Sequence, residues 1–135
     1  MDVIVVPLMR IDMVKGQRTP EEIQKVMQLA YDLTRKDLGV PEDDRFQVVT
    51  QHESYEMKLM DAGLGINRSD DVILFQILST PRTMGQKKFY CKDMVEAFGR
   101  EMNMRPEDVM IVFATNHAED WSFGHGKQQF LDGEL

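Results

Sequence analysis

Apolar residues follow two different spacings along this chain, and together they predict four strands and two helices. Short, nearly continuous apolar runs at 3–13, 46–50, 72–78 and 109–114 are typical of strands. Between the first and second runs, and again between the third and fourth, apolar residues recur about every 3.6 positions, as in an amphipathic helix. The predicted order is therefore strand, helix, strand, irregular segment, strand, helix, strand.

Both predicted helices begin with a capping signal. Thr19 is followed by Pro20 and by Glu22, and Thr83 is followed at the same spacing by Gln86. In this arrangement the threonine hydroxyl and the side chain three residues later satisfy two backbone N–H groups at the helix start. The side chains expected to face a sheet are Ile23, Val26, Met27, Ala30, Leu33 and Leu38 in the first helix and Tyr90, Cys91, Met94, Val95, Phe98 and Met102 in the second.

A stretch of twelve residues occurs twice in the chain. Residues 41–52 align without a gap on residues 106–117, at a constant offset of 65, and five positions are identical. Each copy follows a predicted helix that itself follows a predicted strand, so the chain is interpreted as two tandem βαβ units. The expected parts are a first unit at 7–52, a linking loop at 53–71, a second unit at 72–117 and a tail at 118–135.

This arrangement predicts an α/β (α+β) fold in a single domain, residues 1–135, with residues 1–6 as an extension before Pro7. Right-handed crossovers place two such units side by side as a four-stranded, mainly parallel sheet with both helices on one face. The other face is left bare, so a symmetric homo-oligomer is expected to cover it. The tail is expected to form short hairpin or turn structure rather than helix.

Composition narrows the possible functions. A net charge of −7 argues against nucleic-acid binding, which depends on clustered Lys and Arg. The single cysteine, Cys91, excludes an internal disulfide and a cysteine-rich metal site, and it fits a reducing compartment. No apolar run approaches the ~20 residues of a membrane span, and the run at 3–6 lacks the flank and length of a signal peptide. A cytoplasmic protein without membrane partners is expected.

Other candidate signals are weak. His52, His117 and His125 lack the spacing of a metal cluster, and the matched positions of the first two indicate strand-end roles inherited through the repeat. Gly63-Leu64-Gly65 is too short for a dinucleotide fingerprint. We therefore predict no metal and no cofactor. Cys91 falls on the apolar face of the second helix and is expected to be an inert core residue.

Several short segments, taken in order, carry a family resemblance. They are Pro7-Leu8-Met9-Arg10-Ile11-Asp12, Gly39-Val40-Pro41, Asp44-Arg45-Phe46-Gln47, Gln51-His52, Gly63-Leu64-Gly65, Arg68-Ser69, Pro81-Arg82 and Trp121-Ser122-Phe123-Gly124. In combination they resemble the tautomerase superfamily, and most closely its malonate semialdehyde decarboxylase group. The resemblance covers nearly all of residues 7–135. It implies a β-α-β fold, a homotrimer, and an amino-terminal proline that serves as acid or base.

The resemblance also implies roles for individual residues. By position, Pro7 matches the catalytic proline, Asp44 the aspartate that works with it, and Arg82 an arginine that holds a substrate carboxylate. Thr80 stands where the family has a further arginine. The implied substrates are small carbonyl or keto acids. An apolar, water-excluding wall would be formed by Trp121, Phe123, Phe130 and Leu135.

Two departures from the family pattern change the expected chemistry. Thr80 removes one charge-assisted partner of a substrate carboxylate, so keto–enol tautomerisation is favoured over decarboxylation. Residues 1–6 precede Pro7, which makes its nitrogen a tertiary amide with no hydrogen and no basic lone pair. The proline can therefore act only once these residues are removed. If they remain, residues 3–6 are expected to lengthen the first strand or to fold across the pocket mouth.

Each candidate also has a purely structural explanation. Pro7 can begin a strand at a sheet edge, Asp44 can be a turn residue, and Arg82 can be a solvated residue before a helix cap. The aromatic residues of the tail can be ordinary core or interface residues. The rival hypothesis is accordingly a non-catalytic member of the family, a structural or small-ligand-binding trimer. A third hypothesis is slow turnover by Arg82 and Asp44 with an activated water.

Overall fold

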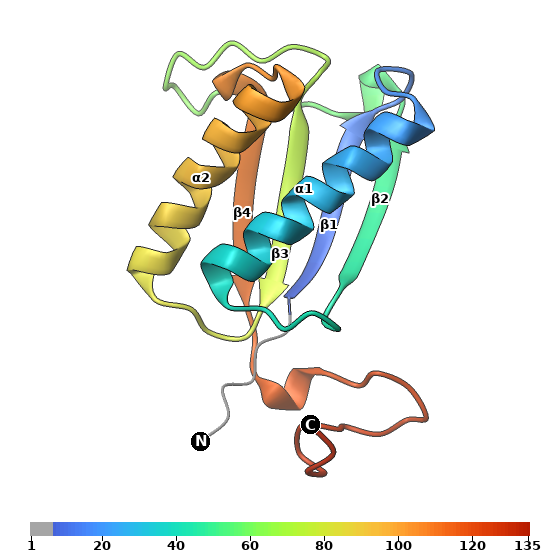
Figure 1. The fold of residues 1–135 in the computed structure, drawn as a ribbon. Coiled ribbons are helices and arrows are strands. Elements are labelled where there is room, and N and C mark those ends of the chain that lie inside the picture. The colour runs from blue at the N-terminus through green and yellow to red at the C-terminus, as the bar shows by residue number, and fades with distance from the viewer. Residues whose placement is uncertain (1–6) are drawn as a thin grey trace.

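The computed structural model describes residues 7–135, so the expected course of residues 3–6 lies outside it. The chain forms a four-stranded sheet with two helices across one face (Figure 1), and the predicted order of elements is confirmed. The strands are β1 (Pro7–Val14), β2 (Phe46–His52), β3 (Ile73–Ser79) and β4 (Val109–Thr115), and the helices are α1 (Pro20–Leu38) and α2 (Met84–Met102).

The sheet has the strand order β2-β1-β3-β4. Each βαβ unit supplies a parallel pair, β1 with β2 and β3 with β4, and the two units meet through the antiparallel pair β1 and β3. The predicted mainly parallel sheet with both helices on one face is therefore confirmed. As a consequence of the central antiparallel pair, β1 and β2 begin at the end of the sheet where β3 and β4 finish.

The helix starts have the geometry that the sequence predicts. The Thr19 hydroxyl accepts from the Glu22 N–H at 3.2 Å, and the Glu22 carboxylate accepts from the Thr19 N–H at 2.9 Å. Thr83 and Gln86 make the same pair of hydrogen bonds at 3.1 and 2.9 Å. Because the caps satisfy N–H groups that the helix itself leaves unpaired, each fixes the residue at which its helix begins.

The core lies between the sheet and the helices. Its centre is the ring pair Phe75 and Phe98, with centroids 5.3 Å apart. Tyr90 is also fully buried, whereas its neighbour Cys91 is only partly buried. The expectation that Cys91 is a core residue is therefore wrong, because the helix turns it toward the outer edge of the sheet. The most deeply buried strand residues alternate along β1 and β3 and are Met9, Ile11, Met13, Ile73, Phe75 and Ile77.

The sheet surface that faces away from the helices, here called the open face, is covered by neither helix (Figure 1). It carries exposed apolar side chains, among them Val48 and Val112, which are 46% and 45% exposed. It also carries a polar group in which the Asp12 carboxylate contacts His52 Nε2 at 2.7 Å and accepts from Gln76 Nε2 at 3.2 Å. His52 is the last residue of β2, as its predicted strand-end role requires.

The sequence repeat corresponds to the two βαβ units of the structure, but the gap-free alignment does not match equivalent residues along their whole length. Phe46 of β2 is 37% exposed on the open face, whereas Ile111, its partner in the gap-free alignment, packs against the core. A shift of one residue moves a strand side chain to the opposite face of a sheet. The equivalence between the two units therefore slips by one residue between the proline turns and the strands that follow.

The segments outside the helices and strands are irregular with short turns. The loop between the two units contains one 3-10 turn, Ser54–Glu56, and the Asp61 carboxylate accepts from the N–H groups of Gly63 and Gly65 at 3.1 and 2.9 Å. The tail contains a 3-10 turn at Ala118–Asp120 and an isolated bridge between Gly124 and Lys127. It extends beyond the end of the sheet where β4 finishes (Figure 1).

Two carboxyl groups meet where α1 and α2 pack together. Burial raises the pKa of Asp37 to about 7, with a further contribution from Asp93 of α2. Lys36 Nζ lies 3.3 Å from the Asp93 carboxylate. Because the folded chain holds the Asp37 proton to higher pH than the unfolded chain, the folded state binds more protons between about pH 4 and 7. The free energy of unfolding therefore falls as the pH rises through this window.

The variant Asp37→Asn is expected to lack this part of the pH dependence. At pH 8 it should exceed the original protein in stability by about 1 kcal/mol, a value reduced for partial solvent screening. Urea unfolding at pH 5 and pH 8 measures the difference. Asp32→Asn, an exposed change on the same helix, is the matched control. An unchanged pH dependence in Asp37→Asn contradicts the assignment.

Candidate active site

The strand register gathers the candidate residues at one end of the sheet. Pro7, the first residue of β1, pairs with Ser79, the last residue of β3. Thr80 and Arg82 follow Ser79 directly, and Asp44 lies two residues before β2 begins. Residues far apart in the sequence therefore lie at the same end of the molecule, and the tail leaves β4 there as well.

Pro7 and Asp44 line the same small hollow, with a volume of about 10 Å³, between α1 and the strands β1 and β2. The other residues that line it are Met9, Tyr31, Thr34, Arg45, Phe46 and Gln47. Pro7 is buried and Asp44 is half-buried. Burial raises the pKa of Asp44, and the neighbouring Asp43 carboxylate raises it further. A carboxyl group that holds its proton more strongly than usual suits a role in proton transfer.

Arg82 links the end of β3 to the end of α1. Its Nε donates to the Leu38 carbonyl at 3.1 Å, and its Nη1 donates to the Thr80 carbonyl at 2.8 Å and to the Thr80 hydroxyl at 3.2 Å. Burial lowers the pKa of Arg82. Within the described part of the chain, its Nη2 is buried without a hydrogen-bond partner. The guanidinium group is thus fixed by the carbonyls of Leu38 and Thr80, and one of its nitrogens stays buried and unpaired.

Thr80 is buried, with 4% of its surface exposed. The residue that replaces an arginine of the family pattern therefore does not extend toward a substrate. Its hydroxyl instead accepts from Arg82 Nη1, so Thr80 positions the arginine that is left. Arg82 itself does not line the hollow of Pro7 and Asp44, and lies beside it at the same end of the sheet.

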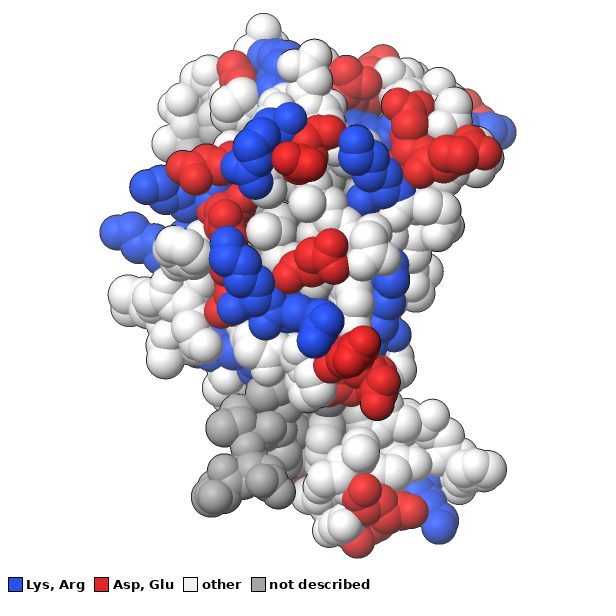
Figure 2. All heavy atoms as spheres, in the orientation of Figure 1, with Lys and Arg blue, Asp and Glu red and all other residues white. Residues whose placement is uncertain are grey.

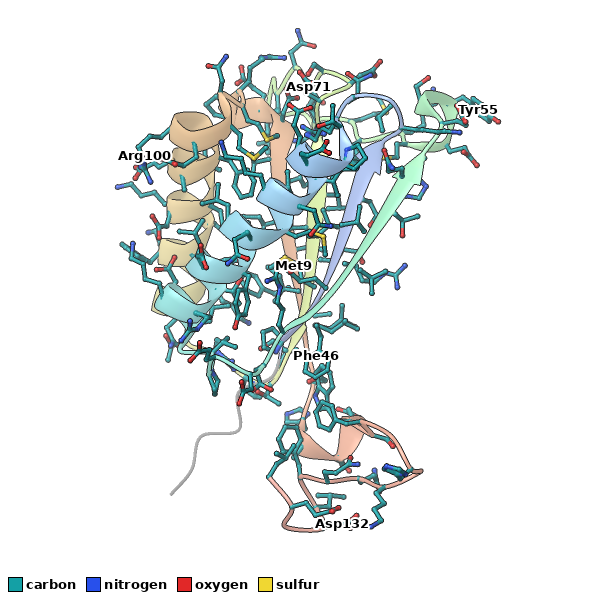
Figure 3. The ribbon with its side chains drawn as sticks, turned by 45° about the vertical axis from the view of Figure 1, so that its right-hand side comes forward. Met9, Phe46, Tyr55, Asp71, Arg100 and Asp132 are labelled. Carbon is teal, nitrogen blue, oxygen red and sulfur yellow. The ribbon has the colours of Figure 1, made fainter. Side chains whose placement is uncertain are left out.

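The aromatic side chains of the tail form a cluster against the start of β2 (Figure 3). Phe123 is central, with Trp121 stacked on it at 5.7 Å, Phe130 at 5.3 Å and Phe46 at 5.6 Å between centroids. Phe46 was not predicted from the sequence as part of this wall, although a large aromatic after Asp44-Arg45 is a usable signal. Leu135 is 68% exposed, so a single chain does not bury it in an apolar wall.

Two further residues of the hollow were missed in the sequence. Arg45 lies with its guanidinium carbon 4.6 Å from the centre of the Tyr31 ring. Tyr31 belongs to α1, and its hydroxyl donates to the Glu42 carbonyl. Only the packing of α1 against the chain before β2 brings these residues together, so sequence spacing could not reveal the contact.

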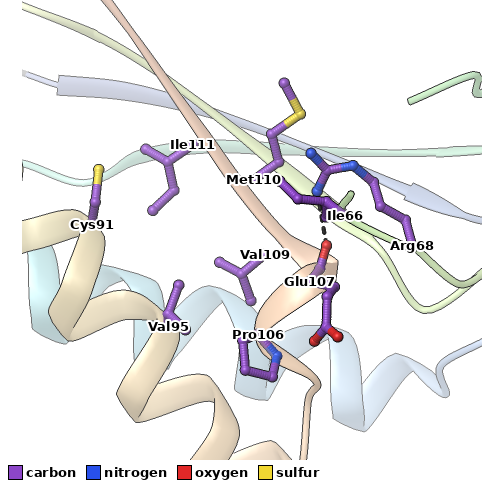
Figure 4. Close-up of a pocket in the computed structure, with 9 residues that line it drawn as sticks. All are labelled: Ile66, Arg68, Cys91, Val95, Pro106, Glu107, Val109, Met110 and Ile111. Carbon is purple, nitrogen blue, oxygen red and sulfur yellow. Dashed lines mark hydrogen bonds between the residues drawn. The ribbon is translucent and has the colours of Figure 1, made fainter. Parts of the chain in front are cut away.

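A larger hollow of about 430 Å³ lies on the other side of the molecule, along α2 and β4 (Figure 4). Its lining is largely apolar and includes Val95, Pro106 and Ile111, with Cys91 and Arg68 at its margin. Burial raises the pKa of the Cys91 thiol, so the reactive thiolate is disfavoured. This hollow contains no candidate acid–base pair.

The surface charges, the possible metal ligands and the helices do not indicate a particular function. On the face seen in Figure 2, acidic and basic side chains are interspersed, without a continuous basic area. Among residues 7–135, no group of three or more His, Cys, Asp and Glu side chains is arranged to hold a metal ion. None of the helices described is long and apolar enough to cross a membrane.

Comparison with known proteins identifies the family. A family model described as "Tautomerase enzyme" matches residues 44–124. The chain is 31% identical over 129 residues to "Probable tautomerase YrdN" of Bacillus subtilis (strain 168), covering 96% of this chain and 99% of that protein. It is 34% identical over 127 residues to "Probable tautomerase YusQ" of the same organism, covering 93% and 99%.

Solved structures agree with this result. Malonate semialdehyde decarboxylase matches with a TM-score of 0.89 and 38% identity, over 95% of this chain and 98% of that one. FG41 malonate semialdehyde decarboxylase inhibited by 3-bromopropiolate matches with a TM-score of 0.86 and 32% identity, over 95% and 97%. A fused 4-OT symmetric trimer shares the fold at 16% identity and a TM-score of 0.70, over 89% and 94%. The resemblance found in the sequence is confirmed, and the chain belongs to the tautomerase family.

Proposed function

We propose that the protein catalyses keto–enol tautomerisation of small keto acids, with the nitrogen of Pro7 as acid or base in chains that begin at this residue. The observation that supports the proposal is that Pro7 and Asp44 line one hollow. A proline at the start of a chain is a secondary amine. In a half-buried, low-dielectric hollow its pKa can approach the working pH, which favours proton transfer in both directions.

Asp44 and Arg82 would complete the chemistry. Asp44, whose pKa is raised by burial, would exchange a proton with the proline or with the substrate oxygen. The half-buried guanidinium group of Arg82 would bind the substrate carboxylate, because charge-assisted hydrogen bonds to a carboxylate are strong. The cluster of Trp121, Phe123 and Phe130 would exclude water, which strengthens these interactions. In this proposal no cofactor or metal takes part.

Decarboxylation of malonate semialdehyde is the second candidate, and it is favoured by the 38% identity to a decarboxylase of known structure. Thr80 argues against it, because the site offers one arginine fewer at this position to restrain the carboxylate that leaves. We therefore place tautomerisation first. A non-catalytic trimer remains the alternative if Pro7 is always preceded by residues 1–6.

We further propose that the protein is a cytoplasmic homotrimer. The open face of the sheet carries exposed apolar side chains that water would otherwise contact, and a symmetric assembly removes them. A solved relative of the same fold is a fused symmetric trimer. The proposed location rests on the single, partly buried cysteine, which needs no oxidising compartment.

The variant Asp44→Asn tests the proposed chemistry in protein that begins at Pro7. Turnover of the enol form of an aryl keto acid is expected to fall about a hundredfold, because Asn cannot transfer a proton. The decay of the enol's ultraviolet absorbance measures the rate. Asp70→Asn, an exposed change in the loop before β3 that does not line the hollow, should stay within about twofold. Equal rates for Asp44→Asn and the original protein contradict the proposal.

A further inference from the structure

The larger hollow, along α2 and β4, has no part in the proposed reaction. Its volume of about 430 Å³ lies within the range of roughly 300–1,000 Å³ that is usual for small-molecule sites. Its side chains come from three segments, namely the loop before β3, the outer side of α2 and the start of β4. It shares no lining residue with the hollow of Pro7 and Asp44, so a ligand bound here would occupy a second site.

The hollow has two apolar walls, one on α2 and the other on β4 (Figure 4). Cys91 and Val95 are one turn apart on α2, and Val109 and Ile111 lie on the same side of β4. Each wall is about 6 Å long, from the rise per residue of a helix and of a strand. Val95 and Ile111 are only half-buried, so part of their apolar surface contacts water. These dimensions suit an alkyl chain of medium length.

The hollow also has a fixed cation at one end. Arg68 lies at the opposite end from Cys91 (Figure 4). Its Nε donates to the Met60 carbonyl at 3.3 Å, and its Nη1 donates to the Glu107 carbonyl at 2.8 Å. Within residues 7–135 its Nη2 makes no hydrogen bond and, unlike Arg82 Nη2, it is not buried. The guanidinium group is thus held in place with one accessible donor.

The positive charge of Arg68 is not paired with a carboxylate in the part of the chain that the structure describes. Glu107 also lines the hollow, but its carboxylate lies 3.3 Å from Arg105 Nη2. Arg68 contributes to the lowered pKa of Asp61, but that carboxylate accepts from two backbone N–H groups of its own loop. An unpaired cation beside an apolar hollow favours a ligand with one negative charge at the end of an apolar chain.

We propose that this hollow binds a medium-chain monocarboxylic acid, with the carboxylate on Arg68 and the alkyl chain between α2 and β4. The carboxylate would accept a charge-assisted hydrogen bond from Arg68 Nη2. The chain would cover Val95 and Ile111 and extend toward Cys91, which removes apolar surface from water. The site goes beyond the proposed function, because binding here needs neither Pro7 nor the other residues of the candidate active site.

Cys91 provides a direct measure of occupancy, because it is the only cysteine of the chain and lines the hollow. The full chain is alkylated with iodoacetamide at about pH 9, since burial raises the pKa of the thiol, and intact mass gives the rate. Butyrate and octanoate are added below the concentrations at which they form micelles. Each buried methylene contributes about fourfold to affinity, so octanoate should protect Cys91 at a concentration about a hundredfold lower than butyrate.

The charge is tested separately from the chain. Octanamide has the same chain without the charge, and it should require a concentration about tenfold higher than octanoate. Arg68→Gln should remove this difference by weakening octanoate alone, and Arg68→Lys, which keeps the charge, should retain part of it. Arg100→Gln is the matched control, because Arg100 is exposed on α2 and does not line the hollow. Its protection by both compounds should equal that of the original protein.

The comparisons of chain length and charge use the original protein, so they test the proposal even if Arg68→Gln does not fold. An alkylation rate that octanoate leaves unchanged overturns the proposal, and so does equal protection by octanoate and octanamide. A preference for octanoate that survives in folded Arg68→Gln also overturns it. If Cys91 does not react with or without octanoate, the hollow is covered by a second copy of the chain, and the proposal fails.

Discussion

Protein that begins at Pro7 is expected to tautomerise small keto acids at least about a thousandfold faster than protein that retains residues 1–6. The reason lies at one atom. In the longer chain the Pro7 nitrogen is a tertiary amide, which can neither donate nor accept a proton at neutral pH. In the shorter chain it is a secondary amine in a half-buried hollow with Asp44.

The comparison needs two preparations of verified length. A cleavable tag placed directly before Pro7 releases the shorter chain, and intact mass distinguishes it from the chain of 135 residues. Pro7→Ala in the shorter chain is the control. Its first residue carries a primary amine in place of the secondary amine of the proline ring. Rapid turnover by the verified longer chain contradicts the assignment of Pro7. If neither preparation is active, the non-catalytic trimer becomes the better hypothesis.

Sequence patterns predicted the fold well because each local signal agreed with the global arrangement. The capping residues Thr19 and Thr83 fix the helix starts, and the alternation in β1 and β3 is the one that buries a core against two helices. The register of the repeat was less predictable. Proline turns can be matched residue by residue, but core packing decides which face of a strand is inward, and it selected a slip of one residue.

The site was predicted only in part, because its parts depend on different kinds of information. The resemblance gave Pro7, Asp44 and Arg82, and the strand register brings them to one end of the sheet. It could not give the contact between Arg45 and Tyr31, which arises from helix packing. Nor could it show that the Thr80 hydroxyl accepts from Arg82. In the sequence, a threonine in place of an arginine indicates only that a positive charge is missing.

The open face gives the second large expected effect. Val112→Asp should convert a trimer of three 15.7 kDa chains into monomers, as measured by sedimentation equilibrium. In a separate chain Val112 is 45% exposed and pairs with the neutral Gln76, so an aspartate there costs little. In the proposed trimer the same carboxylate would be removed from water at the contact, three times over, at a cost of several kcal/mol per charge.

Phe89→Asp is the matched control for this experiment. Phe89 is 56% exposed on α2, away from the open face, so its replacement introduces the same charge and also removes an exposed apolar group. It should leave the trimer intact. Monomeric behaviour of the original protein, or a trimer that survives Val112→Asp, would show that the open face is not the contact between subunits. The result is also relevant to the candidate site. Phe46 lies on the open face, packs against Phe123 of the aromatic cluster, and lines the hollow of Pro7 and Asp44.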